Sequence, residues 1–251
     1  MYSNKNNIRI NTIKMKLVVC SPSTKDFIKG DKYIVIKHPL TVEELEKISM
    51  EYGTVVAIGG GAVMDAAKMI SRYPITAYPT TASGACMTSH AVLWEGTKKI
   101  SVKTAMPKEV IINEDFLISV PLIVLRYSYY DALCHFTEGL MSKNATKEST
   151  QLAMKGLKLL HNFQNRKELI EAGNIGGQVI EITGTNLYHS LSYPLTSYYG
   201  ISHGKALGFL LGKEKIRGID MEIVIDEALK YPKIHDYKFP ITKKYLMERF
   251  K

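Results

Sequence analysis

The sequence predicts a fold in which an α/β N-terminal domain is followed by an all-α C-terminal domain. Short apolar runs alternate with helical patterns from residue 15 to about residue 115, which is typical of a largely parallel sheet. After Pro121 the segments are long and have helical periodicity. No Pro/Gly-rich linker stands near Phe116, so we expect domains 1–115 and 116–251 to pack closely around a cleft that suits a ligand.

Five short apolar runs are the expected strands of the sheet. A helix is expected over residues 41–53, because Thr41 is a suitable N-cap and Glu44, three residues later, is its capping-box partner. Only residues 24–32, TKDFIKGDK, separate the first strand from the YIVIKHP part of the second run, which is too short for a full helix. The runs are KMKLVVC (14–20), KYIVIKHP (32–39), TVVAIGG (54–60), ITAYPTT (75–81) and KEVIIN (108–113). The helical segments beyond them are 121–144, 149–163 and 176–191.

Composition limits the class of protein. With 251 residues, 45% of them hydrophobic, the chain can bury a substantial core. The net charge of +9 is carried by scattered lysines, so we expect a solvated basic surface and no nucleic-acid partner. No apolar run is long enough to span a bilayer and the start lacks a signal-peptide core, which predicts a cytoplasmic protein with no membrane partner. Cys20, Cys86 and Cys134 have no paired spacing and are expected as buried free thiols.

A glycine-rich turn predicts a phosphate-binding site. The apolar run 55–58 leads directly into Gly59, Gly60 and Gly61, which a helical pattern follows. Glycines at such a turn let backbone N–H groups approach phosphate oxygens, and the helix N-terminus adds a favourable dipole. The spacing differs from the GxGxxG fingerprint, and a turn without a ligand is an equally acceptable interpretation of the glycines alone.

One aspartate and three histidines predict a metal site. Asp131 and His135 are four residues apart, which places them on one helix face, and His189 and His203 follow fourteen positions apart. Two helices would then supply one carboxylate and three imidazoles, a mixed set that suits Fe(II) or Zn(II). Each histidine taken alone is more often a core or surface residue.

Four motifs resemble those of the metal-dependent, iron-containing (group III) alcohol dehydrogenase family. This family shares a superfamily with glycerol dehydrogenase and 3-dehydroquinate synthase. The similarity spans residues 15–211 and keeps the spacing between the two later histidines. GGGAVMDAAK is similar to GGGSxxDxxK, PTTASG to PTTAGTGSE, DALCHFTEG to DALTHAIEA, and HSLSYPLTSYYGISHG to H-x-x-x-HPLG…PHG.

The resemblance implies a dehydroquinate synthase-like, iron-type alcohol dehydrogenase fold, with a nucleotide-binding domain and a metal-binding domain. It implies that NAD(P) and a divalent metal are the cofactors. Ser21 ends the first strand, where an aspartate would favour NAD, so NADP is permitted. Lys99 is the expected cofactor-facing lysine, with Lys98 and Lys103 as alternatives. The other expected cofactor contacts are Gly59, Gly60, Gly61, Asp65, Thr80, Thr81 and Ser83, and the metal ligands are Asp131, His135, His189 and His203.

The function implied is hydride transfer between a nicotinamide and a small carbonyl or alcohol, including aldehydes that carry phosphonate or phosphate. Catalysis is assigned to His189, through the metal, and to Tyr193, which replaces a family histidine and would relay a proton. The chain is shorter than ordinary members after His203, so pocket helices are either missing or supplied by a second subunit in a homodimer. The alternatives are a non-catalytic protein that binds a nucleotide or metal, a 3-dehydroquinate synthase-like lyase and a glycerol-1-phosphate dehydrogenase.

Overall fold

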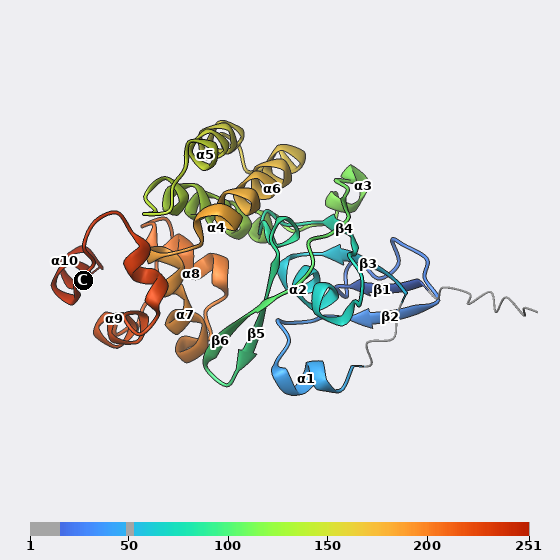
Figure 1. The fold of residues 1–251 in the computed structure, drawn as a ribbon, viewed down its shortest axis with the longest axis horizontal. Coiled ribbons are helices and arrows are strands. Elements are labelled where there is room, and N and C mark those ends of the chain that lie inside the picture. The colour runs from blue at the N-terminus through green and yellow to red at the C-terminus, as the bar shows by residue number, and fades with distance from the viewer. Residues whose placement is uncertain (1–15, 49–52, 251) are drawn as a thin grey trace, which may run out of the picture.

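A five-stranded parallel sheet lies at one end of the molecule and a group of helices lies at the other (Figure 1). The computed structural model describes residues 16–48 and 53–250. The strand order is β2-β1-β3-β4-β7, and every neighbouring pair is parallel. All five predicted runs form a strand, so the sheet expected from the sequence is confirmed. The strands are β1 Lys16–Cys20, β2 Lys32–Val35, β3 Thr54–Gly59, β4 Thr76–Pro79 and β7 Glu109–Val110.

Two helices belong to the sheet half of the molecule. Helix α1, Val42–Glu46, begins with the predicted capping box, in which Thr41 and Glu44 exchange side-chain and backbone hydrogen bonds. It ends earlier than the sequence predicted, and residues 49–52 of the expected helix lie outside the described residues. Helix α2, Gly61–Ile70, follows β3 directly. Residues 21–31 form turns between β1 and β2, as their short length predicted.

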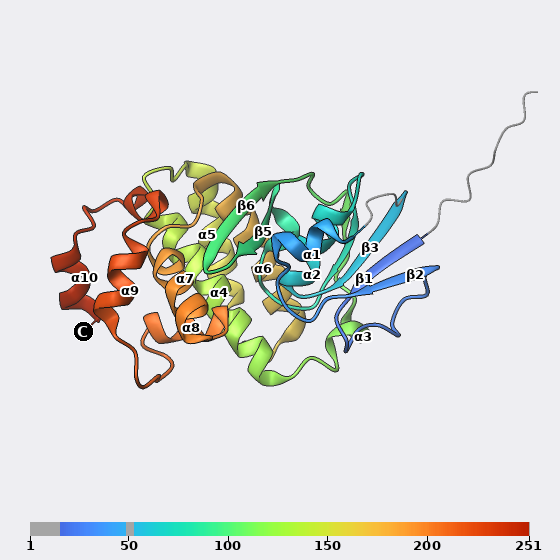
Figure 2. The same cartoon turned by 90° about the horizontal axis from the view of Figure 1, so that it is seen from below.

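An antiparallel hairpin, which the sequence analysis did not anticipate, stands between β4 and β7. Strands β5, His90–Glu95, and β6, Lys98–Lys103, form a separate two-stranded sheet. Gly96 in the turn has a φ of +56°, a left-handed conformation that favours glycine. The hairpin reaches from the sheet half towards α7 (Figures 1 and 2), so it contributes to the space between the two halves.

The second half is helical, as predicted. The segment 176–191 is not one helix, because Gly184, with a φ of +68°, ends α6, and Asn186 caps the start of α7. The α-helices are α3 Glu114–Leu117, α4 Leu122–Leu140, α5 Lys147–Leu159, α6 Arg166–Thr183, α7 Leu187–Tyr199, α8 His203–Leu210, α9 Met221–Ala228 and α10 Lys243–Phe250. Two 3₁₀ helices are η1 Ala85–Met87 and η2 Pro232–Asp236.

The loop after β4 packs directly on α6, which joins the two halves. A Cβ atom added to Gly173 would lie 2.3 Å from the Cα atom of Ala82, and one added to Gly84 would lie 2.7 Å from the backbone nitrogen of Gly177. Only glycine permits backbones to approach this closely. The predicted close packing is therefore present, whereas the boundary between domains 1–115 and 116–251 stays a prediction.

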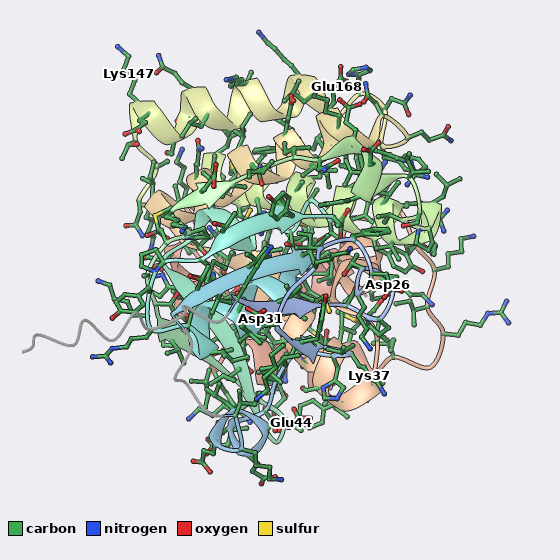
Figure 3. The ribbon with its side chains drawn as sticks, turned by 90° about the vertical axis from the view of Figure 1, so that its right-hand side faces the viewer. Asp26, Asp31, Lys37, Glu44, Lys147 and Glu168 are labelled. Carbon is green, nitrogen blue, oxygen red and sulfur yellow. The ribbon has the colours of Figure 1, made fainter. Side chains whose placement is uncertain are left out.

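Many charged side chains lie at the surface, and the cysteines follow the sequence expectation. The charged side chains of Asp26, Lys37 and Lys147 are exposed, and Lys147 lies on the opposite side of the view from Asp26 and Lys37 (Figure 3). The three cysteines are free and buried, as expected. Within residues 16–48 and 53–250, no helix has the length and apolar character needed to cross a membrane.

Candidate metal and cofactor site

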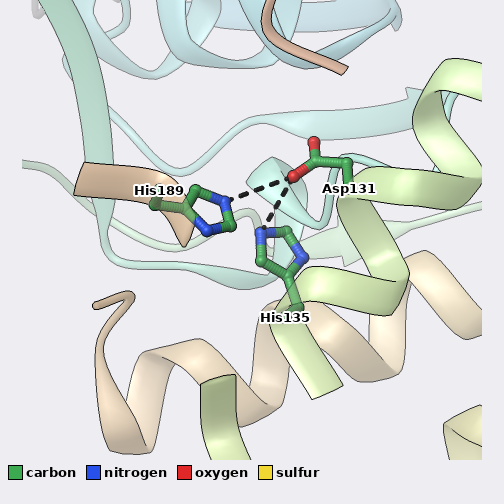
Figure 4. Close-up of side chains that lie close together, drawn as sticks. All are labelled: Asp131, His135 and His189. Atoms are coloured by element: carbon green, nitrogen blue, oxygen red, sulfur yellow. Dashed lines mark ion pairs between the residues drawn. The ribbon is translucent and has the colours of Figure 1, made fainter. Parts of the chain in front are cut away.

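Three histidine side chains converge on the carboxylate of Asp131. The Oδ1 atom of Asp131 lies 3.3 Å from the Nε2 atoms of His135 and His189, and 3.6 Å from that of His203. Figure 4 shows the first two of these pairs. Asp131 and His135 lie one turn apart on α4, as their four-residue spacing predicted. The four predicted ligands therefore lie together.

The ligands come from three helices, which corrects the expectation of two. Helix α7, which carries His189, ends at Gly200, whose φ of +66° is left-handed. Helix α8 then begins at His203. The chain reverses between these helices, so that both histidines face α4 although they are not part of one continuous helix.

The donor set fits a divalent first-row metal ion. One ligand atom from each of Asp131, His135 and His189 lies within 4.8 Å of the others. Asp131 Oδ1 is buried without a hydrogen-bond partner in the described part of the chain, as expected for an oxygen that would bind a cation. Burial tends to raise the pKa of the Asp131 carboxyl, but His135, His189 and His203 hold it well below its usual range. The site thus offers an anionic oxygen and imidazole nitrogens.

The protonation of the imidazoles depends on their neighbours. Burial lowers the pKa of His135 to about 4, which keeps this ring neutral and able to bind a cation. Burial acts in the same direction on His189, but Glu138 and Asp131 outweigh it and raise the pKa of His189 to about 10. The His189 ring therefore holds a proton while it faces these two carboxylates without a cation.

Glu138 is a site residue that sequence reasoning missed. It is fully buried on α4, and its Oε1 atom accepts a hydrogen bond from the backbone N–H of His189 at 2.9 Å. Its Oε2 atom lies 2.5 Å from the Nδ1 atom of His189. Burial raises the pKa of Glu138, but His189 outweighs burial and keeps this pKa below its ordinary value. The signal in the sequence was that Glu138 follows Asp131 by seven residues, or about two helical turns, and so shares a helix face with Asp131 and His135.

The glycine turn and the loop after β4 lie against each other. A Cβ atom added to Gly60 would lie 3.1 Å from Thr81 Oγ1, and one added to Gly61 would lie 3.1 Å from Ser83 Oγ. Gly60 is the N-cap of α2, so backbone N–H groups of the first turn are available at this point. Such an arrangement can bind a phosphate group.

One cavity of about 590 Å³ contains both features. Its wall includes the metal-site residues and, from the predicted cofactor contacts, Gly61, Asp65, Thr81, Ser83 and Lys99. The remaining four predicted contacts, Gly59, Gly60, Thr80 and Ser21, do not line it. Thr80 is buried and donates its backbone N–H to the Gly59 carbonyl, whereas the Ser21 hydroxyl pairs with Ser23 and Thr24.

Lys99 connects the hairpin to the part of the cavity that the predicted metal ligands line. Its Nζ atom donates a hydrogen bond of 2.7 Å to the hydroxyl of Tyr193 and lies 4.1 Å from the ring centroid. Burial raises the pKa of Tyr193, but Lys99 and His189 outweigh burial and lower it. Lys98 and Lys103, the alternatives to Lys99, are exposed. The sequence thus placed Lys99 at the cavity but did not foresee its bond to Tyr193.

Lys68, the last residue of the glycine-rich motif, is buried and binds the backbone near the start of the hairpin. Its side chain is fully buried, and its ammonium lies 3.3 Å from Asp65. It donates to the carbonyl oxygen of Ala85 at 2.7 Å and also to that of His90. Lys68 therefore holds the start of the hairpin against α2, and Asp65 provides its countercharge.

Two family models match this chain. One describes iron-containing alcohol dehydrogenases and matches residues 31–121. The other describes the C-terminal part of the Fe-containing alcohol dehydrogenase family and matches residues 126–216. Together they include both the glycine-rich loop and the converging histidines.

Two similar proteins are reductases. The maleylacetate reductase of Pseudomonas aeruginosa is 29% identical over 184 residues, which cover 66% of this chain and 52% of that protein. The phosphonoacetaldehyde reductase of Streptomyces viridochromogenes is 29% identical over 202 residues, covering 63% of this chain and 51% of that protein. This chain thus spans about half the length of these relatives.

Solved structures share the fold. An iron-containing alcohol dehydrogenase of Thermotoga maritima matches with a TM-score of 0.81 at 21% identity, covering 94% of this chain and 90% of that chain. A sulfoacetaldehyde reductase of Bifidobacterium kashiwanohense, in complex with NAD+, matches with a TM-score of 0.79 at 20% identity and the same coverage. These likenesses confirm the predicted fold class.

Proposed function

This chain belongs to the iron-containing alcohol dehydrogenase family, and from that premise we propose that it is a metal-dependent, NAD(P)-linked alcohol dehydrogenase or aldehyde reductase. The observation that carries the proposal is that a single cavity is lined both by the loop residues predicted to bind phosphate, Gly61, Thr81 and Ser83, and by the three histidines that converge on Asp131. Hydride transfer requires a cofactor and a polarised carbonyl to be close together in the same enclosed space. We place the protein in the cytoplasm, where its three buried free thiols would persist.

The cradle would bind the pyrophosphate of the cofactor. Gly61 offers the N-terminus of α2, and Thr81 and Ser83 offer hydroxyl groups beside it. A nicotinamide cofactor bound here would supply or accept the hydride. Ser21, at the end of β1, would leave space for a 2′-phosphate, so we propose NAD or NADP without a choice between them.

Asp131, His135, His189 and His203 would hold the divalent cation, Fe(II) or Zn(II). When bound, this ion would stabilise the negative charge that develops on the substrate oxygen. Tyr193 lies one helical turn after His189 and would supply the proton that this oxygen takes up. Because Lys99 donates to the phenolic oxygen, the proton of the Tyr193 hydroxyl remains available for donation into the cavity.

We propose a small carbonyl compound with an anionic group as the substrate class. Maleylacetate and phosphonoacetaldehyde, after which the two relatives are named, both carry such a group. Lys99 and Lys233 line the cavity here and provide positive charge. The net charge of +9 would favour the approach of anions. Aldehydes that carry a phosphonate or phosphate group are the first candidates.

The test is turnover by protein loaded with metal. Protein reconstituted with Fe(II) or Zn(II) is mixed with NADH or NADPH and a panel of anionic and neutral aldehydes, and absorbance reports cofactor oxidation. We expect turnover in the wild type, loss of it in Asp131→Asn, and retention in the control Asp226→Asn, which changes an exposed carboxylate on α9. Cofactor and metal binding without turnover of any aldehyde would overturn the proposal and indicate a non-catalytic binding protein.

A further inference from the structure

The side chain of His189 is fixed by a carboxylate behind it. The Oε1 atom of Glu138 accepts a hydrogen bond of 2.9 Å from the backbone N–H of His189. Its Oε2 atom lies 2.5 Å from the Nδ1 atom of the same histidine. A carboxylate can only accept hydrogen bonds, so Nδ1 is the donor in this pair. A cation bound at Nε2 would displace the proton from that atom, and the neutral imidazole would then keep its single N–H group on Nδ1 and present the Nε2 lone pair on the side of Asp131.

A serine fixes the side chain of His203 in the same way. Ser192 is fully buried and donates its one hydroxyl proton to the backbone carbonyl of His189, at 2.8 Å. Its oxygen lies 3.2 Å from the Nδ1 atom of His203 and must therefore accept from that atom. The Nε2 atom of His203, which faces Asp131, is again left with its lone pair.

His135 differs from the other two histidines. Its Nδ1 atom has no hydrogen-bond partner among the residues that the structure describes. Packing holds its ring instead, because a Cβ atom on Gly176 would lie 3.2 Å from Nδ1 and the ring stacks on that of His189 with centroids 4.9 Å apart. Hydrogen bonds therefore select the tautomer of two imidazoles, while packing alone orients the third.

We propose that Glu138 and Ser192 are positioning residues of the metal site, which fix His189 and His203 in the tautomers that present Nε2 to the cation. The proposal rests on the metal site of the proposed function. Neither residue would touch the ion, and both act through a ligand. Residues of this kind orient metal ligands and typically contribute 10- to 100-fold, as a rough range, to metal affinity.

The test measures metal affinity in Glu138→Gln and Ser192→Ala. Glutamine keeps the shape of the side chain, but an NH2 group replaces one of the two carboxylate oxygens and cannot accept, so one of the two N–H groups of His189 loses its acceptor. The control is Ser190→Ala, the same change at another buried serine of α7. Zn(II) and Co(II) are titrated against a competing chelator, without cofactor or aldehyde. We expect about 10- to 100-fold weaker binding in both variants and little change in the control.

A second measurement separates positioning from general destabilisation. Metal stabilises the folded state by an amount that depends on the ratio of metal concentration to Kd, so weaker binding narrows the gap in Tm between metal-loaded and metal-free protein. A narrower gap in Glu138→Gln and Ser192→Ala, with the wild-type gap in Ser190→Ala, supports the proposal. An equal fall in Tm with and without metal, at unchanged affinity, overturns it.

The metal-affinity test of Glu138 and Ser192 can be decided separately from the turnover test of the proposed function. If the wild type binds metal and the variants bind it weakly, the positioning roles stand even when no aldehyde is reduced. If all variants bind metal as tightly as the wild type, the positioning roles fall, while turnover by the wild type still supports the dehydrogenase. Ser192→Ala, a smaller change than Glu138→Gln, keeps the test valid should the glutamine variant fail to fold.

Discussion

Tyr193 combines three features of a proton donor. Its side chain is buried at the cavity, its helix also carries the ligand His189, and a lysine ammonium binds its oxygen at 2.7 Å. Lys99 would stabilise the phenolate that remains if Tyr193 donates its proton as proposed, in keeping with the lowered pKa of Tyr193. A tyrosine in this environment is a stronger acid than one in water.

Tyr193→Phe should therefore reduce turnover while leaving the site assembled. Because phenylalanine keeps the ring but loses the hydroxyl, we expect kcat for aldehyde reduction to fall about 100-fold or more, with a small change in KM. The control is Tyr198→Phe, on the same helix at a position that is 52% exposed. Steady-state kinetics with NAD(P)H decide the matter, and a Tyr193→Phe enzyme as fast as the control would exclude the phenol as proton donor.

Sequence spacing was informative for residues that share a helix and less so for residues on different helices. Asp131 and His135 could be paired because helical geometry places positions four apart on one face. Glu138 could not be recognised as a partner of His189, since 51 residues separate them and only the packing of α4 against α7 brings them together. Side-chain alternation along β6 separates Lys99 from Lys98, whereas Lys103 lies on the same strand face as Lys99 and differs from it only because it does not line the cavity.

At the scale of elements, α6 and the loop after β4 approach so closely that a single added methyl group should disturb their contact. Gly173→Ala would place a Cβ atom 2.3 Å from the backbone of Ala82, which cannot move without the loop that carries Thr81 and Ser83. Alanine favours a helix over glycine by up to about 1 kcal/mol, but the forced displacement should cost about 1–3 kcal/mol. The substitution should therefore destabilise the protein overall, because the nearest atoms that the new Cβ would meet belong to the backbone of Ala82 and cannot move aside as a flexible side chain could.

The expected result for Gly173→Ala is a lower free energy of unfolding, measured with denaturant. Gln178→Ala, at a half-buried position on the same helix, is the control for the change to alanine. Cofactor binding should weaken together with stability, since the displaced loop lines the cavity. A variant as stable as the wild type would show that the loop can move away from α6 at little cost.

Glu181 on α6 binds Ser89 at the base of the hairpin, and the stability that this contact contributes should depend on pH. Its carboxylate accepts hydrogen bonds from the backbone N–H of Ser89, at 2.9 Å, and from the hydroxyl of that residue. Burial raises the pKa of Glu181, but Ser89 and His90 outweigh it and bring the pKa below the ordinary 4.5. A depressed pKa in the folded state means that the contribution to stability is present above 4.5 and is lost as the pH falls through the folded value.

Glu181→Gln should therefore destabilise the protein at neutral pH by less than about 1 kcal/mol, because the group is partly exposed. The difference from the wild type should shrink as the pH falls below 4.5. Denaturant unfolding of both proteins across this range provides the measurement. A difference that stays constant with pH would mean that the charge of Glu181 plays no part in holding the hairpin.

The sequence predicted the sheet more completely than the elements that surround the cavity. The central strands β1 and β3 are almost wholly buried, so their continuous apolar runs could be recognised. The hairpin strands are half exposed, and their alternating patterns, HAVLWE and KKISVK on either side of Gly96, are a weaker signal than a continuous apolar run. The break between α6 and α7 depends on Gly184 and Asn186, which interrupt a pattern that otherwise remains helical.

At the scale of the whole molecule, the predicted metal site lies among the helices of one apolar core and away from another. One core lies between α2 and the sheet, with members such as Leu17, Ala57 and Ile70. Another joins α4, α7 and α8 through Cys134, Leu191 and other residues. The four predicted metal ligands lie in α4, α7 and α8, so a bound cation would tie together three helices of the second core and none of the first.

Metal removal should consequently loosen one half of the molecule more than the other. Without a cation, the buried Asp131 carboxylate and the imidazoles lose the partner that they would share, which lowers the local stability of α4, α7 and α8. We expect amide hydrogen exchange to accelerate in these three helices after chelation, while β1, β3 and α2 keep their protection. The control is Asp131→Asn, in which chelator should change little because metal binding is already weakened. Faster exchange throughout the protein would instead mean that the sheet and the helices unfold as one cooperative unit. Exchange unaffected by chelation would show that the three helices need no ion to stay packed.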